Sequence, residues 1–92
     1  MVNVIENRAR VELRPLTPLA PGPAENWRVC KVKVETSSEV PGYPNLLGSD
    51  LPRELDALVP AAVLDELGTA TRWRVEASLV GPGRLRVERA VD

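Results

Sequence analysis

Histidine is absent from this sequence of 92 residues, and cysteine occurs once, at Cys30. Without histidine the chain lacks the commonest general base at neutral pH, the commonest metal ligand and both the Ser-His and Cys-His nucleophile pairs. Cys30 lies within an apolar strand pattern, where burial would raise its pKa and leave the thiol unreactive. We therefore expect no enzymatic activity, no metal ion and no cofactor, and we expect Cys30 to be a core residue.

Carboxylate pairs are the remaining route to acid–base or metal chemistry. Glu54 and Asp56 stand two residues apart, so on a strand they share the solvent-facing side. Asp65 and Glu66 are adjacent on the outside of an expected helix. Exposed acids mainly provide solubility, and no spacing typical of a calcium-binding loop is present. These acids therefore indicate a solvated surface.

Long apolar runs are missing as well. No stretch approaches the roughly 20 residues that a membrane-spanning helix needs, and residues 1–3 lack the basic start of a signal peptide. One cysteine cannot form an intrachain disulfide, so nothing points to a secreted scaffold. With 43% hydrophobic and 27% charged residues, the composition predicts one domain over residues 1–92, cytoplasmic and without membrane contact.

The clearest positive signal is a period of two in the final segment, residues 72–91. Because glycine can take positive φ and proline presets φ at about −65°, the chain can reverse at Gly81-Pro82-Gly83. Alternation on both sides of such a turn is typical of a β-hairpin with one buried face. The alternating apolar residues are Trp73, Val75, Ala77 and Leu79 before the turn, and Leu85, Val87 and Val91 after it.

Three earlier segments also have the pattern of strands. Residues 8–16 alternate apolar and charged side chains, and residues 27–36 alternate valine with lysine and glutamate. Residues 53–59 alternate apolar with mostly acidic side chains and predict a third strand. A helix beginning at Arg53 is the alternative for that third segment.

The remaining segments are a short helix and two loops. Residues 61–67 are expected to be helical, because Pro60 suits the first turn and Gly68 suits the position after the last turn. Residues 17–26 and 37–52 are rich in proline, glycine, serine and asparagine, so irregular loops are expected there.

The second strand contains a change of phase. Trp27 and Val29 place its apolar face on odd positions, whereas Cys30, Val32 and Val34 place it on even positions. A β-bulge near Val29 and Cys30 would supply the one residue needed to change phase, and it would bend the strand. Strongly bent strands are what closing a small barrel requires, and Trp27 is then expected in the core.

The expected order of elements is strand, strand, strand, short helix, strand, strand. A helix between the third and fourth of five strands resembles the OB-fold, a partly open Greek-key barrel. The resemblance rests on this order, the bulged second strand and the final hairpin. It implies a mainly β, five-stranded antiparallel barrel, and barrels of this kind often use their strand faces to bind nucleic acid. Another small barrel, or a sandwich, would produce a similar pattern.

The loop at residues 40–48 is the leading candidate for a binding site. It combines an aromatic residue, two leucines and rigidifying prolines, a composition suited to a protein contact. We expect a non-catalytic interaction module that contacts a protein partner through Tyr43, Asn45, Leu46 and Leu47. The alternative is that Tyr43, Leu46 and Leu47 fold back and close one end of the barrel core.

The alternative function is weak binding of single-stranded nucleic acid by basic strand faces. The expected outward positions carry Arg8, Arg10, Lys31, Lys33, Arg72, Arg74, Arg84 and Arg86. Exposed aromatic residues for base stacking are scarce, which argues against this function. The glutamates that interleave with these cations could also pair with them across strands; they are Glu12, Glu35, Glu76 and Glu88.

Charge is divided along the chain, although the net charge is only −1. Residues 37–71 carry six acids and one base, a net charge of −5, and the rest carries eleven bases and seven acids, a net charge of +4. The small total argues against strong nonspecific attraction to nucleic acid. An acidic segment opposite basic strands also makes self-association an alternative to a separate protein partner.

Overall fold

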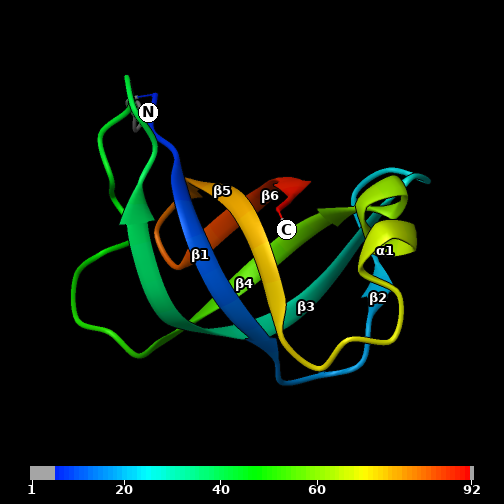
Figure 1. Ribbon diagram of the computed structural model, residues 1–92. Coiled ribbons are helices and arrows are strands. Elements are labelled where there is room, and N and C mark those ends of the chain that lie inside the picture. Colours follow the sequence, from blue (N-terminus) through cyan, green and yellow to red (C-terminus); the bar gives the residue numbers. More distant parts are fainter. Residues whose placement is uncertain (1–5, 92) are drawn as a thin grey trace.

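The computed structural model describes residues 6–91, so the expectation about residues 1–3 lies outside the described part. Six strands and one helix follow one another along these residues (Figure 1). They are β1 (Ala9–Pro15), β2 (Ala20–Pro21), β3 (Trp27–Glu39), β4 (Arg53–Pro60), α1 (Ala61–Leu67), β5 (Trp73–Gly81) and β6 (Arg84–Ala90).

Five of the strands close into a barrel. β1, β5, β6, β4 and β3 are neighbours in that order, and β1 also pairs with β3 (Figure 1). This confirms the mainly β, OB-like barrel with its helix between the third and fourth barrel strands. The prediction of a purely antiparallel barrel was wrong, because β4 and β6 run parallel over residues 56–58 and 84–86. Strand directions cannot alternate around a closed ring with an odd number of strands, so five strands require a parallel pair.

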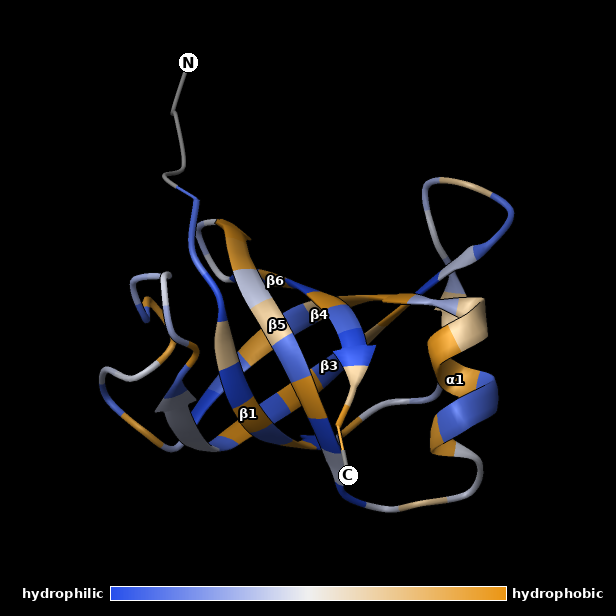
Figure 2. Ribbon diagram, turned by 45° about the horizontal axis from the view of Figure 1, so that its top comes forward, coloured by the Kyte–Doolittle hydropathy of each residue, from blue (hydrophilic) through white to orange (hydrophobic). Residues whose placement is uncertain are grey.

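Alternate side chains of the barrel strands fill the core, so apolar and polar residues alternate along each strand (Figure 2). α1 and the 40–48 loop lie at opposite ends of the barrel, and they add Val63 and Leu47 to the core (Figures 1 and 2). The strand contributions are Ala9, Val11, Leu13, Cys30, Val32, Val34, Leu55, Ala57, Val59, Trp73, Val75, Ala77, Leu85 and Val87.

The helix has the predicted boundaries. Pro60 is its N-cap in an extended conformation, and Gly68 ends it with a φ of 60°, where a side chain would be strained. The Gly68 N–H donates to the Leu64 carbonyl oxygen at 3.0 Å, which satisfies one carbonyl of the last turn. No helix within residues 6–91 has the length and apolar character to cross a membrane.

The bulge predicted near Val29 and Cys30 was wrong. The pairing of β3 with β4 is continuous from Trp27 to Val34, so the odd positions at the start of β3 face outward. Trp27 is accordingly half-buried and outside the core. The extra residue occurs later in β3, at Glu35, where the register with β1 shifts. Both apolar phases of β3 were expected to face one core, whereas they face opposite sides of the strand.

The segment before β3 is more ordered than an irregular loop. β2 pairs with β3 antiparallel, and the Gly22 N–H donates to the Trp27 carbonyl oxygen at 3.0 Å. Before β2, the Leu16 N–H donates to the Lys31 carbonyl oxygen at 2.7 Å. Thr17 Oγ1 accepts from the Lys31 N–H at 2.9 Å. Residues 16–21 therefore run along β3 and form a raised wall beside it.

Candidate binding groove

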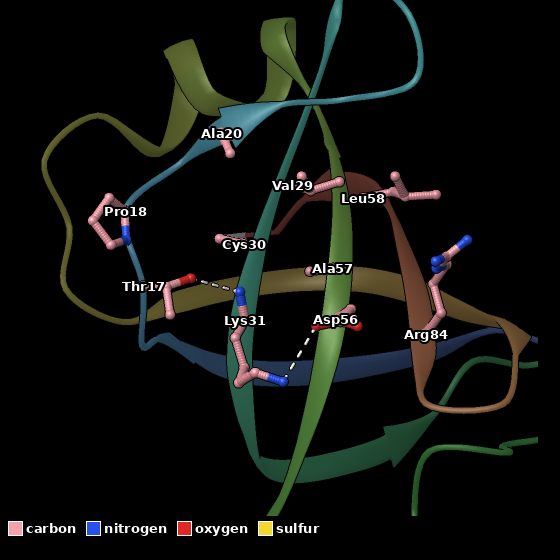
Figure 3. A pocket seen from close by; sticks show the side chains of 10 residues that line it. All are labelled: Thr17, Pro18, Ala20, Val29, Cys30, Lys31, Asp56, Ala57, Leu58 and Arg84. Carbon is pink, nitrogen blue, oxygen red and sulfur yellow. Dashed lines mark hydrogen bonds and ion pairs between the residues drawn. The ribbon is translucent and has the colours of Figure 1, made fainter.

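A hollow of about 370 Å³ lies on the outer face of the barrel, between this wall, β3, β4 and the start of β6 (Figure 3). We call it the groove. The wall forms one side, and Arg84 lies across β4 on the other side (Figure 3). The residues that line the groove are Thr17, Pro18, Ala20, Val29, Cys30, Lys31, Asp56, Ala57, Leu58 and Arg84.

The floor of the groove is aliphatic. Val29 and Leu58 are cross-strand partners, both half-buried, and both point away from the core. Cys30 and Ala57, the next pair, are core residues that also line the groove. Burial raises the pKa of the Cys30 thiol, which favours the protonated, unreactive form. The floor can therefore accept an apolar side chain, and it offers no nucleophile.

A charged row crosses the groove next to the apolar pair. Lys31 pairs with Asp56 across β3 and β4, and the Lys31 Nζ lies 3.4 Å from the Asp56 Oδ1 (Figure 3). Arg84 is the partner of Asp56 in the parallel β4–β6 pair. All three side chains are exposed, and among residues 6–91 Arg84 has no carboxylate within ion-pair distance. One carboxylate thus stands between two cations, and the row has a net charge of +1.

The wall also carries exposed apolar side chains. Leu16 and Leu19 are 41% and 46% exposed, and they are the exposed large hydrophobic residues of the described chain. Both belong to the segment whose Thr17, Pro18 and Ala20 face the groove. The wall therefore carries the large apolar side chains that are most exposed in the described residues.

The four residues predicted to contact a partner lie at the end of the barrel. Leu47 is 1% exposed and belongs to the core. The Asn45 Oδ1 accepts from the Leu47 N–H at 2.9 Å and from the Ser37 hydroxyl at 3.1 Å. Tyr43 is half-buried with the Arg8 guanidinium 5.1 Å from its ring centre, and Leu46 is half-buried. Much of this loop therefore closes the barrel end.

The structure spreads the eight predicted cations around the barrel. Lys31, Lys33, Arg84 and Arg86 come from β3 and β6, on either side of β4, whereas Arg8, Arg10, Arg72 and Arg74 belong to β1, β5 or the residues just before them. Most of them have an acidic neighbour, which reduces the positive field around them. Arg8 and Arg10 pair with Glu76, Arg8 and Arg86 with Glu88, Arg72 with Glu35, Arg74 with Glu12, and Lys31 with Asp56.

The most buried of these clusters surrounds Glu76 on β5. Its side chain is buried, and its carboxylate lies 2.7 Å from Arg89, 3.4 Å from Arg8 and 3.5 Å from Arg10. The hydrogen bond from Arg89 lowers the pKa of Glu76, and the charges of Arg89, Arg8 and Arg10 lower it further against the opposing effect of burial. This cluster ties the N-terminal end of β1 to β5 and β6, so we interpret it as structural.

Comparisons of the chain with protein-family models, with curated proteins and with solved structures found no match. The site is therefore defined by its geometry alone. Within the described residues, no three potential metal-ligating side chains come together. The groove was not predicted from the sequence, although the sequence contains a signal for it: Val29 and Leu58 are apolar residues in the polar phase of their strands.

Proposed function

We propose that this chain is a non-catalytic, cytoplasmic module that binds a protein partner, and that a segment of the partner lies in the groove. The observation that carries the proposal is the outward-facing apolar pair, Val29 and Leu58, on a barrel face whose other outward residues are mostly charged. Exposed apolar residues that gather in a concave site rimmed by charge are typical of binding surfaces.

The composition of the groove favours a protein over nucleic acid. Binding of single-stranded nucleic acid without sequence preference relies on aromatic side chains on which bases stack. Of the described residues that line the groove, none is aromatic. Valine, leucine and alanine instead offer the kind of surface on which an aliphatic or aromatic side chain of a protein is buried.

The burial of Leu47 and the hydrogen bonds of Asn45 favour the groove over the 40–48 loop as the contact. A residue that holds the core closed cannot also bury itself in a partner without exposing that core. Leu16 and Leu19, by contrast, are exposed and belong to the segment that forms the wall, so their apolar surface is open to solvent.

The contact is made by side chains and not by strand addition. β2 is the outermost strand, and among the described strands it pairs only with β3. Its free edge would be the place for a partner strand to add, but Pro18, Pro21 and Pro23 in and around it have no N–H to donate. The wall therefore resists edge-to-edge pairing while it leaves the groove accessible.

Selection of a displayed library of random peptides on the immobilised chain tests the proposal. Enriched peptides should shift the backbone amide resonances of residues 17–20, 29–31, 56–58 and 84 in two-dimensional NMR spectra. Leu58→Arg should abolish this binding, because it fills the groove with a charged chain. The matched control is Ala62→Arg, which places the same side chain on the exposed face of α1.

Four results would contradict the proposal. Enriched peptides that still bind Leu58→Arg would place the contact elsewhere. Resonance shifts confined to residues 43–47 would indicate that the 40–48 loop is the contact. Strong oligonucleotide binding at low ionic strength, steeply weakened by salt, would favour the nucleic-acid function. Shifts at the groove that grow with protein concentration in the absence of peptide would identify a second copy of the chain as the partner.

A further inference from the structure

We infer that the segment bound in the groove is extended and acidic, with an apolar side chain and a carboxylate two residues apart. The inference rests on the proposed function, since it specifies the occupant of the same groove. Its basis is the juxtaposition of the apolar pair, Val29 and Leu58, with the charged row of Lys31, Asp56 and Arg84.

The charged row determines the sign of the partner's charge. Asp56 stands between Lys31 and Arg84 in the strand register, and the Lys31 ammonium already lies 3.4 Å from it. Arg84 has no acidic neighbour within ion-pair distance among residues 6–91, whereas Arg86 on the same strand lies 2.9 Å from Glu88. A guanidinium offers a fork of donors that matches a carboxylate in two parallel hydrogen bonds. Arg84 is therefore the groove's available anion receptor.

The register of β3 and β4 determines the spacing of the two peptide side chains. Val29 precedes Lys31 by two residues on β3, and Leu58 follows Asp56 by two residues on β4. Two residues on a strand span about 7 Å, and side chains at that spacing point to the same side. A peptide that runs along the strands in extended conformation repeats this distance, so its side chains two residues apart meet the apolar pair and the charged row. Either chain direction satisfies this spacing.

Residues of the wall lie beside both the apolar pair and the charged row. Ala20 on β2 pairs with Val29, beside the apolar pair, and Thr17 is hydrogen-bonded to Lys31, beside the charged row. The groove therefore extends along the strands for these two positions, with an apolar end at Ala20 and a cationic end at Arg84 (Figure 3). A basic segment would place like charge against Lys31 and Arg84, which disfavours it.

The same displayed library, selected in parallel on wild type and on charge variants, tests the inference. Wild type should enrich peptides with Asp or Glu two positions from an apolar residue. Arg84→Glu should replace that acidic preference with Lys or Arg, while Arg84→Gln should remove it. Arg74→Glu is the matched control with the same change of charge on β5, outside the groove, and it should leave the preference unchanged.

An enriched peptide should also lose about two- to fivefold in affinity when its acid is changed to the amide, since ion pairs exposed to solvent have effects of that size. The loss should vanish on Arg84→Gln. Peptides that require Leu58 but show no acidic preference would overturn this inference and leave the proposed function intact. A selection that yields no peptide dependent on Leu58 would overturn both.

Discussion

Val29 and Leu58 lie directly opposite each other across the β3–β4 pair, and both face away from the barrel core. The next outward pair along the strands is Lys31 and Asp56, so the apolar pair adjoins a charged one. Two aliphatic side chains that stay partly exposed contribute less to the free energy of folding than fully buried ones. This pair therefore leaves apolar surface on the outer face and adds little to the stability of the barrel.

Replacing Leu58 by serine should cost less than about 1 kcal/mol of unfolding free energy, because the side chain is already half exposed. Leu55→Ala, three residues earlier and directed into the core, should cost about 2–5 kcal/mol. Urea unfolding followed by fluorescence of the buried Trp73 measures both. Equal losses for the two variants would show that Leu58 is part of the core.

Neutralising Glu76 should destabilise the fold. Glu76→Gln leaves Arg8, Arg10 and Arg89 without their shared carboxylate, and we expect a loss of about 2 kcal/mol. The effect is smaller than for a fully buried pair because the arginines are partly exposed to solvent. Glu66→Gln, on the exposed side of α1, is the control and should change the unfolding free energy by less than about 0.5 kcal/mol. A loss no larger than that of the control would contradict the structural role of Glu76.

Acid should destabilise the protein through the same residue. The pKa of Glu76 is lower in the fold than its ordinary value of 4.5, so the unfolded chain takes up a proton first as the pH falls. The stabilisation by Glu76 is fully present above that value and is lost as the pH falls through the lower pKa of the folded state. Unfolding free energies of wild type and Glu76→Gln, measured between neutral and acidic pH, should therefore converge on acidification. Parallel curves would contradict the pKa shift.

The side chain of Asn7 makes the two backbone hydrogen bonds to β5 that a residue of a neighbouring strand would make. Its amide accepts from the Leu79 N–H at 2.7 Å and donates to the Leu79 carbonyl oxygen at 3.0 Å. Asn7→Ala should cost about 1–2 kcal/mol and speed hydrogen exchange of the Leu79 amide. Glu6→Ala, at the exposed neighbouring position, is the control and should change neither. Unchanged protection of Leu79 in Asn7→Ala would contradict this role.

Gly22 allows the wall to lie close to β3. A Cβ atom on it would lie 2.9 Å from the main-chain carbon, the carbonyl oxygen and the Cβ of Trp27, so Gly22→Ala forces the backbones apart. We expect a loss of about 1–3 kcal/mol together with weaker peptide binding, because the wall moves. Gly81→Ala is the control, since a Cβ there meets no atom within 4 Å. Undiminished peptide affinity in Gly22→Ala would show that the wall is not part of the site.

Much of the fold could be predicted because its signals are local. The alternation around Gly81-Pro82-Gly83 predicted the hairpin of β5 and β6, and Pro60 and Gly68 predicted the ends of α1. Local rules failed at the start of β3, where an apolar residue can belong either to the core or to a binding face. The odd phase at Trp27 and Val29 was interpreted as a bulge within one buried face, whereas Val29 lines the groove.

The candidate site could not be predicted, because none of its parts carries a distinctive signal in the sequence. Arg84 was one of eight predicted cations, and only the parallel pairing of β6 with β4 places it opposite Asp56. Segment 17–26 has an irregular pattern in the sequence because it is held in place by hydrogen bonds to β3, and these do not depend on its own conformational propensities. Burial of Glu76 likewise depends on three arginines that are distant in sequence.

The sequence by itself determined the five barrel strands, the helix and the alternation that separates core from surface, because these depend on neighbours along the chain. Only the tertiary structure decided which outward residues meet. Closing five strands into a ring forces one parallel contact, and that contact brings Arg84 to the charged row beside Val29 and Leu58. The cationic end of the groove is therefore a consequence of barrel closure, which no local pattern contains.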